Sequence, residues 1–191
     1  MKSILTQIGQ YFLMLNKTFS FPEKKSVFFK QFNLELEKIG LNSLGIVTII
    51  SFFIGAVVSI QTAFNFESPI YPKYLIGYAT RESLILEFCP TMLALILAGK
   101  VGSNIASEIG SMRVTEQIDA LEIMGVNSAS FLILPKIFAT VLFFPILIIL
   151  SITIGLLGGW IGCQTAGITT ASFLYGIKYE FNSFYVTYCL I

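Results

Sequence analysis

The sequence predicts an all-α integral membrane protein, and its composition supplies the first reasons. Only 12% of the residues are charged, about half of the roughly 25% found in an ordinary soluble domain. Hydrophobic residues make up 55% of the chain, and the mean hydropathy is +0.80. A soluble chain of 191 residues could not bury that much Phe, Ile and Leu and still cover its outside with polar groups. Lipid must therefore surround much of the surface.

Residues 1–40 are expected to form an N-terminal cytoplasmic or interfacial helical region, and residues 41–191 a transmembrane domain. From Pro22 to Gly40, apolar residues recur at mostly three- and four-residue spacing with lysines between them, which is typical of an amphipathic helix in the membrane interface. A helix that packs on a partner subunit explains the same pattern equally well. Met1–Ser20 lacks the continuous apolar core and the cleavage site of a signal peptide.

The first of three spanning helices is predicted from Leu41 to Phe64, a run without a charged residue. At about 1.5 Å per residue this run covers about 36 Å, more than the roughly 30 Å of a hydrocarbon core. The third is predicted within the uncharged run from Ile137 to Ile177, which is long enough for one span and part of a far-side segment. Trp160, after Gly158 and Gly159, suits the exit from the lipid, and Pro145 is expected to kink the helix.

The second spanning helix, Leu84 to Ser107, is predicted from its small residues, because Glu87 and Lys100 interrupt its apolar run. One row, spaced by four residues, contains Ala98, Gly102, Ala106 and Gly110, and the adjacent row contains Gly99, Ser103, Ser107 and Ser111. Residues four apart share a helix face, and helices in lipid associate through such smooth faces. The rows therefore predict a packed spanning helix, although chance clustering in a helix rich in Gly, Ala and Ser is the alternative.

The basic residues predict the orientation of these spans. Six lysines precede residue 41: Lys2, Lys17, Lys24, Lys25, Lys30 and Lys38. The loop at about 65–83 has only Lys73 and Arg81. By the positive-inside rule the N-terminus is cytoplasmic, the loop at 65–83 lies outside, and the segment around 108–135 is cytoplasmic again.

A short helix of about nine residues is predicted within the cytoplasmic segment 108–125. Thr115 is a suitable N-cap, and Glu116 and Asp119 in the first turn favour the positive helix end. Gly125 suits the position that ends the helix. A helix this short does not persist alone in water, so it must pack on something.

This short helix has an apolar and a charged side. The apolar side would hold Ile118, Leu121, Ile123 and Met124, and the charged side Glu108, Arg113, Glu116, Asp119 and Glu122. Joined to spanning helices at both ends, it is suited to receive a push from a cytoplasmic partner. A simple surface connector is the alternative, and a catalytic role for the carboxylates is weaker because no nucleophile or metal-ligand spacing accompanies them.

The same segment carries a family resemblance. Glu-Ile-Gly-Ser-Met-Arg-Val-Thr-Glu-Gln-Ile-Asp-Ala-Leu at 108–121, with Ala-Gly-Lys-Val-Gly-Ser at 98–103 and Leu-Pro-Lys at 134–136, strongly resembles the MlaE/YrbE permease family. The similarity extends from about Gly40 to the end, through 54–61 and 158–160. Members of this family are the membrane subunits of Mce-associated ABC transporters that move phospholipids.

The resemblance implies a homodimeric permease of the bacterial inner membrane, with two cytoplasmic ATPase subunits that bind ATP and Mg²⁺, an Mce-domain partner, and phospholipid held between the two permease copies. The helix near 115–124 would be the coupling helix that docks in the ATPase. Its contact residues would be Glu108, Arg113, Thr115, Glu116, Gln117, Asp119, Leu121 and Glu122. Residues near the lipid cavity would be Ile60, Gln61, Phe64 and Glu87.

Two departures from the family pattern stand out. Where the family often has Arg-Glu-Leu-Gly-Pro, this chain reads Leu-Glu-Phe-Cys-Pro at 86–90, so the Arg is missing, and Arg81 substitutes only if its loop folds back. Family members usually continue for two further spans, whereas this chain stops at Ile191. Residues 186–191 resemble the start of a fourth span, which suggests a C-terminally incomplete transmembrane domain.

Composition excludes several other functions. A net charge of +1 gives no reason to expect nucleic acid as a partner, and the sequence has no His to act as a general base or zinc ligand. Cys89, Cys163 and Cys189 lie far apart in apolar stretches, which disfavours a disulfide or a metal site. No GxxxxGK[ST] motif is present, so this chain itself is expected to bind no ATP and no other cofactor.

Charge within the second span leaves a second hypothesis open. Lys100 can extend toward the cytoplasmic interface, whereas Glu87, near the outer end, is either a hydrated interfacial residue, a cavity residue for lipid transfer or part of a proton relay. The last of these corresponds to an ion- or proton-coupled secondary carrier that uses Glu87.

Overall fold

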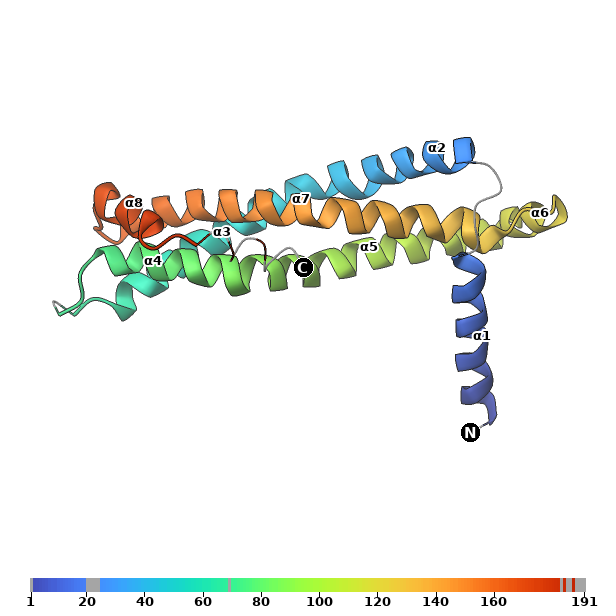
Figure 1. Cartoon of the computed structure of the whole chain (residues 1–191), viewed down its shortest axis with the longest axis horizontal. Coiled ribbons are helices and arrows are strands. Elements are labelled where there is room, and N and C mark those ends of the chain that lie inside the picture. Colours follow the sequence, from blue (N-terminus) through green and yellow to red (C-terminus); the bar gives the residue numbers. More distant parts are fainter. Residues whose placement is uncertain (1, 20–24, 69, 183, 185–186, 188–191) are drawn as a thin grey trace. The chain divides into compact units, whose positions relative to one another are not determined.

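The computed structural model describes residues 2–19, 25–68, 70–182, 184 and 187, and every regular element among them is helical. The elements, in chain order (Figure 1), are α1 (Lys2–Thr18), α2 (Lys25–Leu36), the π-helix η1 (Glu37–Leu41), α3 (Asn42–Asn65), α4 (Tyr74–Ser83), the π-helix η2 (Leu84–Phe88), α5 (Cys89–Val114), α6 (Gln117–Ile123), α7 (Ser128–Thr165) and α8 (Thr170–Lys178). The all-α prediction is confirmed.

Three continuous helical stretches are long and apolar enough to cross a membrane. They are Val27–Asn65, Tyr74–Val114 and Ser128–Thr165, with 39, 41 and 38 residues. A hydrocarbon core needs only about 20 helical residues, so each stretch extends well beyond it. The predicted three spans are therefore present, each as part of a longer helix.

The helix boundaries differ from those predicted. The expected loop at 65–83 is shorter, because α4 occupies Tyr74–Ser83 and continues through η2 into α5. The helix that holds the third span is longer than one crossing needs, since α7 runs unbroken from Ser128 through Pro145 to Thr165, and the exit from the lipid near Trp160 stays a prediction. Apart from Thr187, the expected start of a fourth span at 186–191 lies outside the described residues.

The π-helix η2 has a local cause in Pro90, the second residue of α5. Proline lacks an N–H donor, and its ring collides with the carbonyl four residues earlier. A π-helix bonds each carbonyl to the N–H five residues on, and the Cys89 N–H donates to the Leu84 carbonyl in this way. The helix thus passes the proline without ending.

The chain forms two compact units that are each discontinuous in sequence. One comprises Met1–Asn42 and Lys100–Phe143, and the other comprises Ser43–Gly99 and Phe144–Ile191. The helices α5 and α7 contribute to both units. The division at residue 40 into an interfacial region and a transmembrane domain stays a prediction.

In the second unit, α3 and α7 pack backbone against backbone through small residues. A Cβ added to Gly55 would lie 2.8 Å from the Gly155 Cα, and one added to Gly158 would lie 2.9 Å from the Phe52 carbonyl carbon. Ser51 and Ser151 share a hydrogen bond of 2.7 Å between their hydroxyl oxygens. Gly158, which was expected near the exit from the lipid, also has a packing role: it has no side chain and so leaves room for the backbone of α3.

The predicted small-residue stripe of the second span packs on none of the described residues. Ala98, Gly102, Ala106 and Gly110 are all exposed, and a Cβ added to Gly102 or Gly110 would meet nothing within 4 Å. This face of the helix is open and carries only small side chains, and the packing expected for it stays a prediction. Spacing of small residues identifies such a face without identifying its partner.

Gly55→Ala is expected to destabilise the chain, whereas Gly102→Ala is expected to stabilise it. The first adds a methyl group against the Gly155 backbone, and overpacking of this kind costs about 1–3 kcal/mol. The second adds a methyl group in open space and gains helix propensity, worth about 0.5–1 kcal/mol. The contrast is measured by unfolding the wild-type chain and both variants in one detergent. Equal changes in stability for the two variants would contradict the α3–α7 packing.

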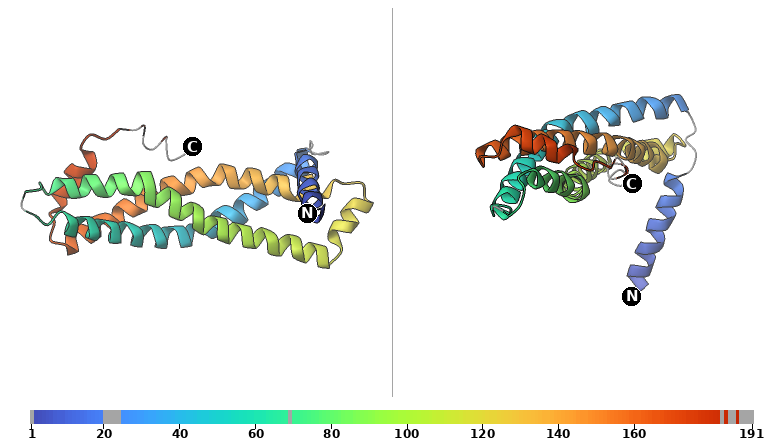
Figure 2. Two further views of the ribbon diagram at one scale, coloured as in Figure 1. Left: turned by 90° about the horizontal axis from the view of Figure 1, so that it is seen from below. Right: turned by 60° about the vertical axis from the view of Figure 1, so that its left-hand side comes forward.

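The helices α4 and α8 of the second unit also pack closely (Figure 2). A Cβ on Gly77 would lie 3.2 Å from the Phe173 Cα, and one on Gly176 would lie 2.8 Å from the Tyr78 nitrogen. The Phe173 side chain of α8 is fully buried, in a cluster with Ile76 of α4 and with Cys163 and Ile168. Paired glycines thus let these two short helices approach, as they do for α3 and α7.

Candidate functional site: a short exposed helix between two spanning helices

The predicted short helix is present as α6, between the end of α5 and the start of α7. It has seven residues rather than about nine. Thr115 is not its N-cap, which corrects the prediction: the Thr115 hydroxyl donates to the Ser111 carbonyl at 2.8 Å and so closes the last turn of α5. Glu116 takes the N-cap position with a φ of 57° and no side-chain cap. The left-handed backbone at Glu116 separates α5 from α6.

The predicted end of α6 at Gly125 is confirmed. Gly125 has a φ of +79°, a conformation that favours glycine. Its N–H donates to the Glu122 carbonyl at 3.0 Å, and the Val126 N–H donates to the Leu121 carbonyl at 3.0 Å. This pair of bonds is a Schellman motif, which satisfies carbonyls that the helix end leaves unpaired.

No residue of α6 is buried, and its most apolar residues protrude. Ile123 is 87% exposed, and Met124 and Val114, which flank the helix, are also exposed. Ile118 and Leu121 are half-buried. The predicted apolar side is therefore split between a part that faces the chain and a part that remains open. Large exposed apolar side chains at the tip of a hairpin are typical of an interaction site.

Two polar contacts tie α6 to its flanking helices. The Arg113 guanidinium of α5 donates to the Asp119 carboxylate at 2.6 Å, and the Ser128 hydroxyl of α7 donates to the Glu122 carboxylate at 2.9 Å. Both contacts are exposed, so each contributes little to stability. They do restrict the direction of α6. Glu116 and Gln117 are exposed at its start.

Glu108 lies apart from this group, on α5. Its carboxylate pairs with Lys136 of α7 and with Lys38 of η1, and Lys136 also pairs with Glu35 of α2. These four residues are called the ion cluster below. Of the eight residues expected to contact an ATPase, the structure thus brings seven together around α6 and places Glu108 in the ion cluster.

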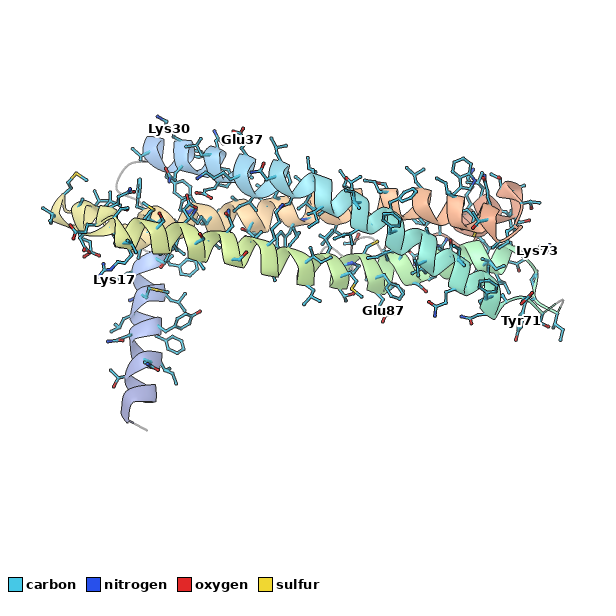
Figure 3. The ribbon with its side chains drawn as sticks, turned by 180° about the vertical axis from the view of Figure 1, so that it is seen from behind. Lys17, Lys30, Glu37, Tyr71, Lys73 and Glu87 are labelled. Carbon is cyan, nitrogen blue, oxygen red and sulfur yellow. The ribbon has the colours of Figure 1, made fainter. Side chains whose placement is uncertain are left out.

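The residues expected near a lipid cavity lie mostly on the surface of the described part of the chain. Gln61, Phe64 and Glu87 are exposed, Ile60 is half-buried, and the Glu87 side chain points outward (Figure 3). They lie on outward-facing surfaces of α3 and η2.

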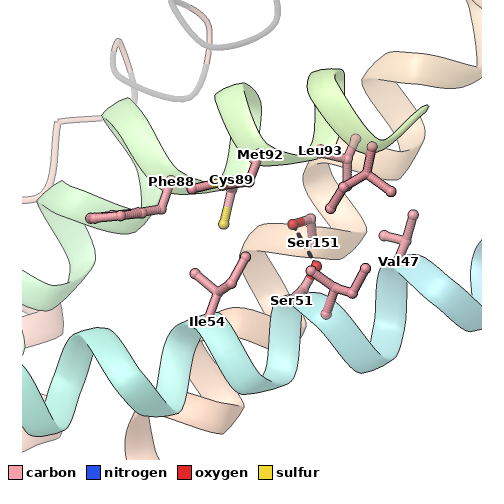
Figure 4. A pocket seen from close by; sticks show the side chains of 10 residues that line it. Val47, Ser51, Ile54, Phe88, Cys89, Met92, Leu93 and Ser151 are labelled. Atoms are coloured by element: carbon pink, nitrogen blue, oxygen red, sulfur yellow. Dashed lines mark hydrogen bonds between the residues drawn. The ribbon is translucent and has the colours of Figure 1, made fainter. Parts of the chain in front are cut away.

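A small hollow does lie between α3, α5 and α7 in the second unit (Figure 4). Its volume is about 10 Å³, which is room for one water molecule and not for an acyl chain. Apart from Ser51 and Ser151, its walls are formed by apolar side chains and Cys89. It is therefore a packing defect rather than a lipid site.

Arg81 does not stand in for the missing family Arg. It lies in α4, its side chain is 1% exposed, and it donates to the carbonyls of Ile177 and Tyr179 at 2.7 and 2.8 Å. It also pairs with Glu82. These bonds commit the guanidinium to the end of α8 and leave it closed to a lipid headgroup.

Sequence reasoning missed the partners of Glu35, Arg81 and Lys136. A usable signal was present, because a charged residue inside or beside an apolar helix normally needs a partner. Lys136 stands at the edge of a long uncharged run, and Glu35 lies between apolar residues of the predicted interfacial helix. The sequence could flag each charge as one that needs a partner, but only the fold brings the pairs together.

Comparison with known proteins gives a consistent result. Residues 32–191 match the model of a family described as "Permease MlaE". A probable ABC transporter permease protein of Rickettsia bellii is 39% identical over 123 residues, which cover 64% of this chain and 47% of that protein. One from Synechocystis is 39% identical over 127 residues, with coverage of 65% and 47%.

A third relative is the intermembrane phospholipid transport system permease protein MlaE of Haemophilus influenzae. It is 34% identical over 143 residues, which cover 73% of this chain and 53% of that protein. The chain spans about half the length of the curated relatives it matches. Neither the family match nor these relatives support the alternative of a secondary carrier that uses Glu87. With a family match that begins within α2 and continues to residue 191, this chain belongs to the MlaE permease family.

Proposed function

We propose that this chain is the membrane-spanning, non-catalytic permease subunit of an ABC transporter that moves phospholipid between membranes. The observation that carries the proposal is α6, an exposed short helix held between two spanning helices within a chain of the MlaE permease family. The name of the Haemophilus influenzae relative supports phospholipid as the substrate.

The energy would come from a partner ATPase subunit that binds ATP and Mg²⁺. The sequence contains no P-loop motif, which supports a separate energy source. The surface of α6 suits such a partner, because Ile123 and Met124 offer apolar anchors at its end and Glu116 and Asp119 offer carboxylates nearer its start. A hydrophobic groove with a basic rim is the complementary surface.

A second copy of the chain would complete the lipid site. Gln61, Phe64 and Glu87 face outward from α3 and η2, and the small-residue stripe of α5 is open. In a homodimer these surfaces would enclose phospholipid between the copies. An Mce-domain protein would then receive or deliver the lipid on the far side.

We place the chain in the bacterial inner membrane, as the family resemblance implies, and the distribution of lysines supports an N-terminus in the cytoplasm. That orientation puts α6 on the same side as a cytoplasmic ATPase. Labelling of Met124→Cys with a membrane-impermeant maleimide in sealed vesicles tests it, because only vesicles with the cytoplasmic face outward should react.

Reversing a charge on α6, or placing a charge at one of its apolar residues, is expected to remove the ATPase from the complex. With the wild-type chain, purification in detergent should recover the ATPase in stoichiometric amount, and Asp119→Lys or Ile123→Asp should abolish this recovery. Glu67→Lys, in the exposed turn after α3, is the matched control and should retain the ATPase. Equal recovery with all four proteins, or labelling that puts Met124→Cys on the far side, would contradict the proposed function.

A further inference from the structure

The ion cluster is a chain of four alternating charges in the first unit. The Lys136 amine donates to the Glu35 carboxylate at 2.6 Å and to Glu108, and the Lys38 amine donates to the other Glu108 oxygen at 2.9 Å. The side chains of Glu35 and Lys136 are only 2% and 4% exposed. Two acids and two bases make the cluster neutral, and its inner pair is shielded from water.

The cluster joins the two helices that carry α6 to the helix that precedes the first span. Glu108 lies near the end of α5, and Lys136 lies near the start of α7. Glu35 belongs to α2 and Lys38 to η1. Any displacement of α6 must move at least one of its flanking helices, and both are tied by ion pairs to the α2–η1 segment.

Apolar packing holds the same three segments together. Ile39 of η1, Val101 of α5 and Ala139 of α7 form one buried cluster. Gly40 lies so close to α7 that an added Cβ would be 2.7 Å from the Phe143 ring atom Cε1. The Lys100 amine also donates to the Asn42 carbonyl, where η1 passes into α3. The α2–η1 segment is therefore packed tightly against α5 and α7.

Stability alone does not explain the buried pair of Glu35 and Lys136. Removing two charges from water is costly, and apolar side chains of similar size in such positions are often as stable or more so. A buried ion pair fixes one arrangement of its helices, because any other arrangement leaves a charge unpaired. The adjoining π-helix η1 is a second indication of a functional role, since π-helical segments frequently occur at functional sites.

We propose that Glu35 and Lys136 are positioning residues that couple movement of the α5–α6–α7 hairpin to the α2–η1 segment. An ATPase that displaces α6 would then pull α2–η1 with it. Because η1 continues directly into α3, the displacement reaches the first span. This role rests on the proposed function, and it adds a defined mechanical link between ATP hydrolysis and lipid movement.

The test compares lipid transfer with ATP hydrolysis for the permease and its ATPase in the same proteoliposomes. Glu35→Leu combined with Lys136→Met removes the inner ion pair and leaves Glu108 paired with Lys38. We expect ATP hydrolysis to continue while the amount of lipid transferred per ATP falls at least about five-fold. A five-fold change is the lower end of the effects that coupled sites typically have on each other. The matched control, Lys30→Met with Glu37→Leu, makes the same exchanges at exposed positions of α2 and η1 (Figure 3) and should keep the wild-type ratio.

Lys38→Met provides a second variant that is expected to fold, because the Lys38 side chain is 50% exposed. It removes the outer ion pair and should lower the same ratio by a smaller factor. An unchanged lipid-to-ATP ratio in the double variant overturns the coupling role. If that protein does not fold, Glu35→Gln combined with Lys136→Gln takes its place, because neutral amides of similar size can still hydrogen-bond, and an unchanged ratio there overturns the role as well. If the wild-type permease and its ATPase transferred lipid equally well with and without ATP, that result would count against the proposed function itself.

Discussion

Replacing Lys136 with Met alone is expected to destabilise the chain by about 3–5 kcal/mol, because it leaves the Glu35 carboxylate buried without a partner. Glu108 keeps Lys38, so the cost arises chiefly at Glu35. Adding Glu35→Leu should recover most of the loss, since the second substitution removes the orphaned charge. Chemical or thermal unfolding in detergent measures both steps.

The contrast between the single and the double variant is the informative quantity. Lys38→Met, at the exposed end of the ion cluster, serves as the control and should cost no more than about 1 kcal/mol. If Lys136→Met is as stable as the double variant, Glu35 is not held by Lys136 and the buried pair does not exist as described. A recovered stability together with lost lipid transfer would separate the positioning role of the pair from its contribution to folding.

The three spans followed directly from the sequence because transfer into lipid depends on local composition. An uncharged run as long as Leu41–Phe64 has no other stable environment, and α3 at Asn42–Asn65 agrees with it closely. The end of α6 was also predictable from the nearby sequence, since Gly125 adopts a positive φ that suits glycine. Properties that one segment determines alone were therefore predictable.

Properties that depend on a distant partner were not predictable in this way. The spacing of Gly102 and Gly110 correctly indicated a smooth face on α5, but it carried no information about what that face meets. The start of α6 failed for a different reason: Thr115 has the right chemistry for an N-cap, but the left-handed backbone falls at Glu116, so α6 begins one residue later and the Thr115 hydroxyl donates to the Ser111 carbonyl instead. For Glu35 and Lys136, about a hundred residues of chain separate the partners, and only the packing of α2 on α7 unites them.

Replacing Arg81 with Met is expected to destabilise the α4–α8 pair by about 3–5 kcal/mol, the range found when one partner of a buried ion pair is removed. Arg81 donates to the carbonyls of Ile177 and Tyr179, at the end of α8, where a helix has no donors of its own. Its guanidinium also stacks on the Tyr78 ring, 4.9 Å from the centroid. Loss of Arg81 therefore exposes unpaired carbonyls and leaves Glu82 without its cation.

Hydrogen exchange across 170–182 is the decisive measurement for this prediction, because it reports the end of α8 directly. Arg81→Met should speed exchange there, and Arg81→Lys should do so less, since an ammonium keeps the charge but cannot reproduce the planar set of donors. Lys178→Met is the matched control: this lysine is exposed in the last turn of α8, so its loss should cost less than about 1 kcal/mol. If Lys178→Met and Arg81→Met speed exchange equally, general attraction to the negative helix end is sufficient and the buried cap has no special role. If only Arg81→Met does so, one buried side chain of α4 determines whether α8 persists as a helix.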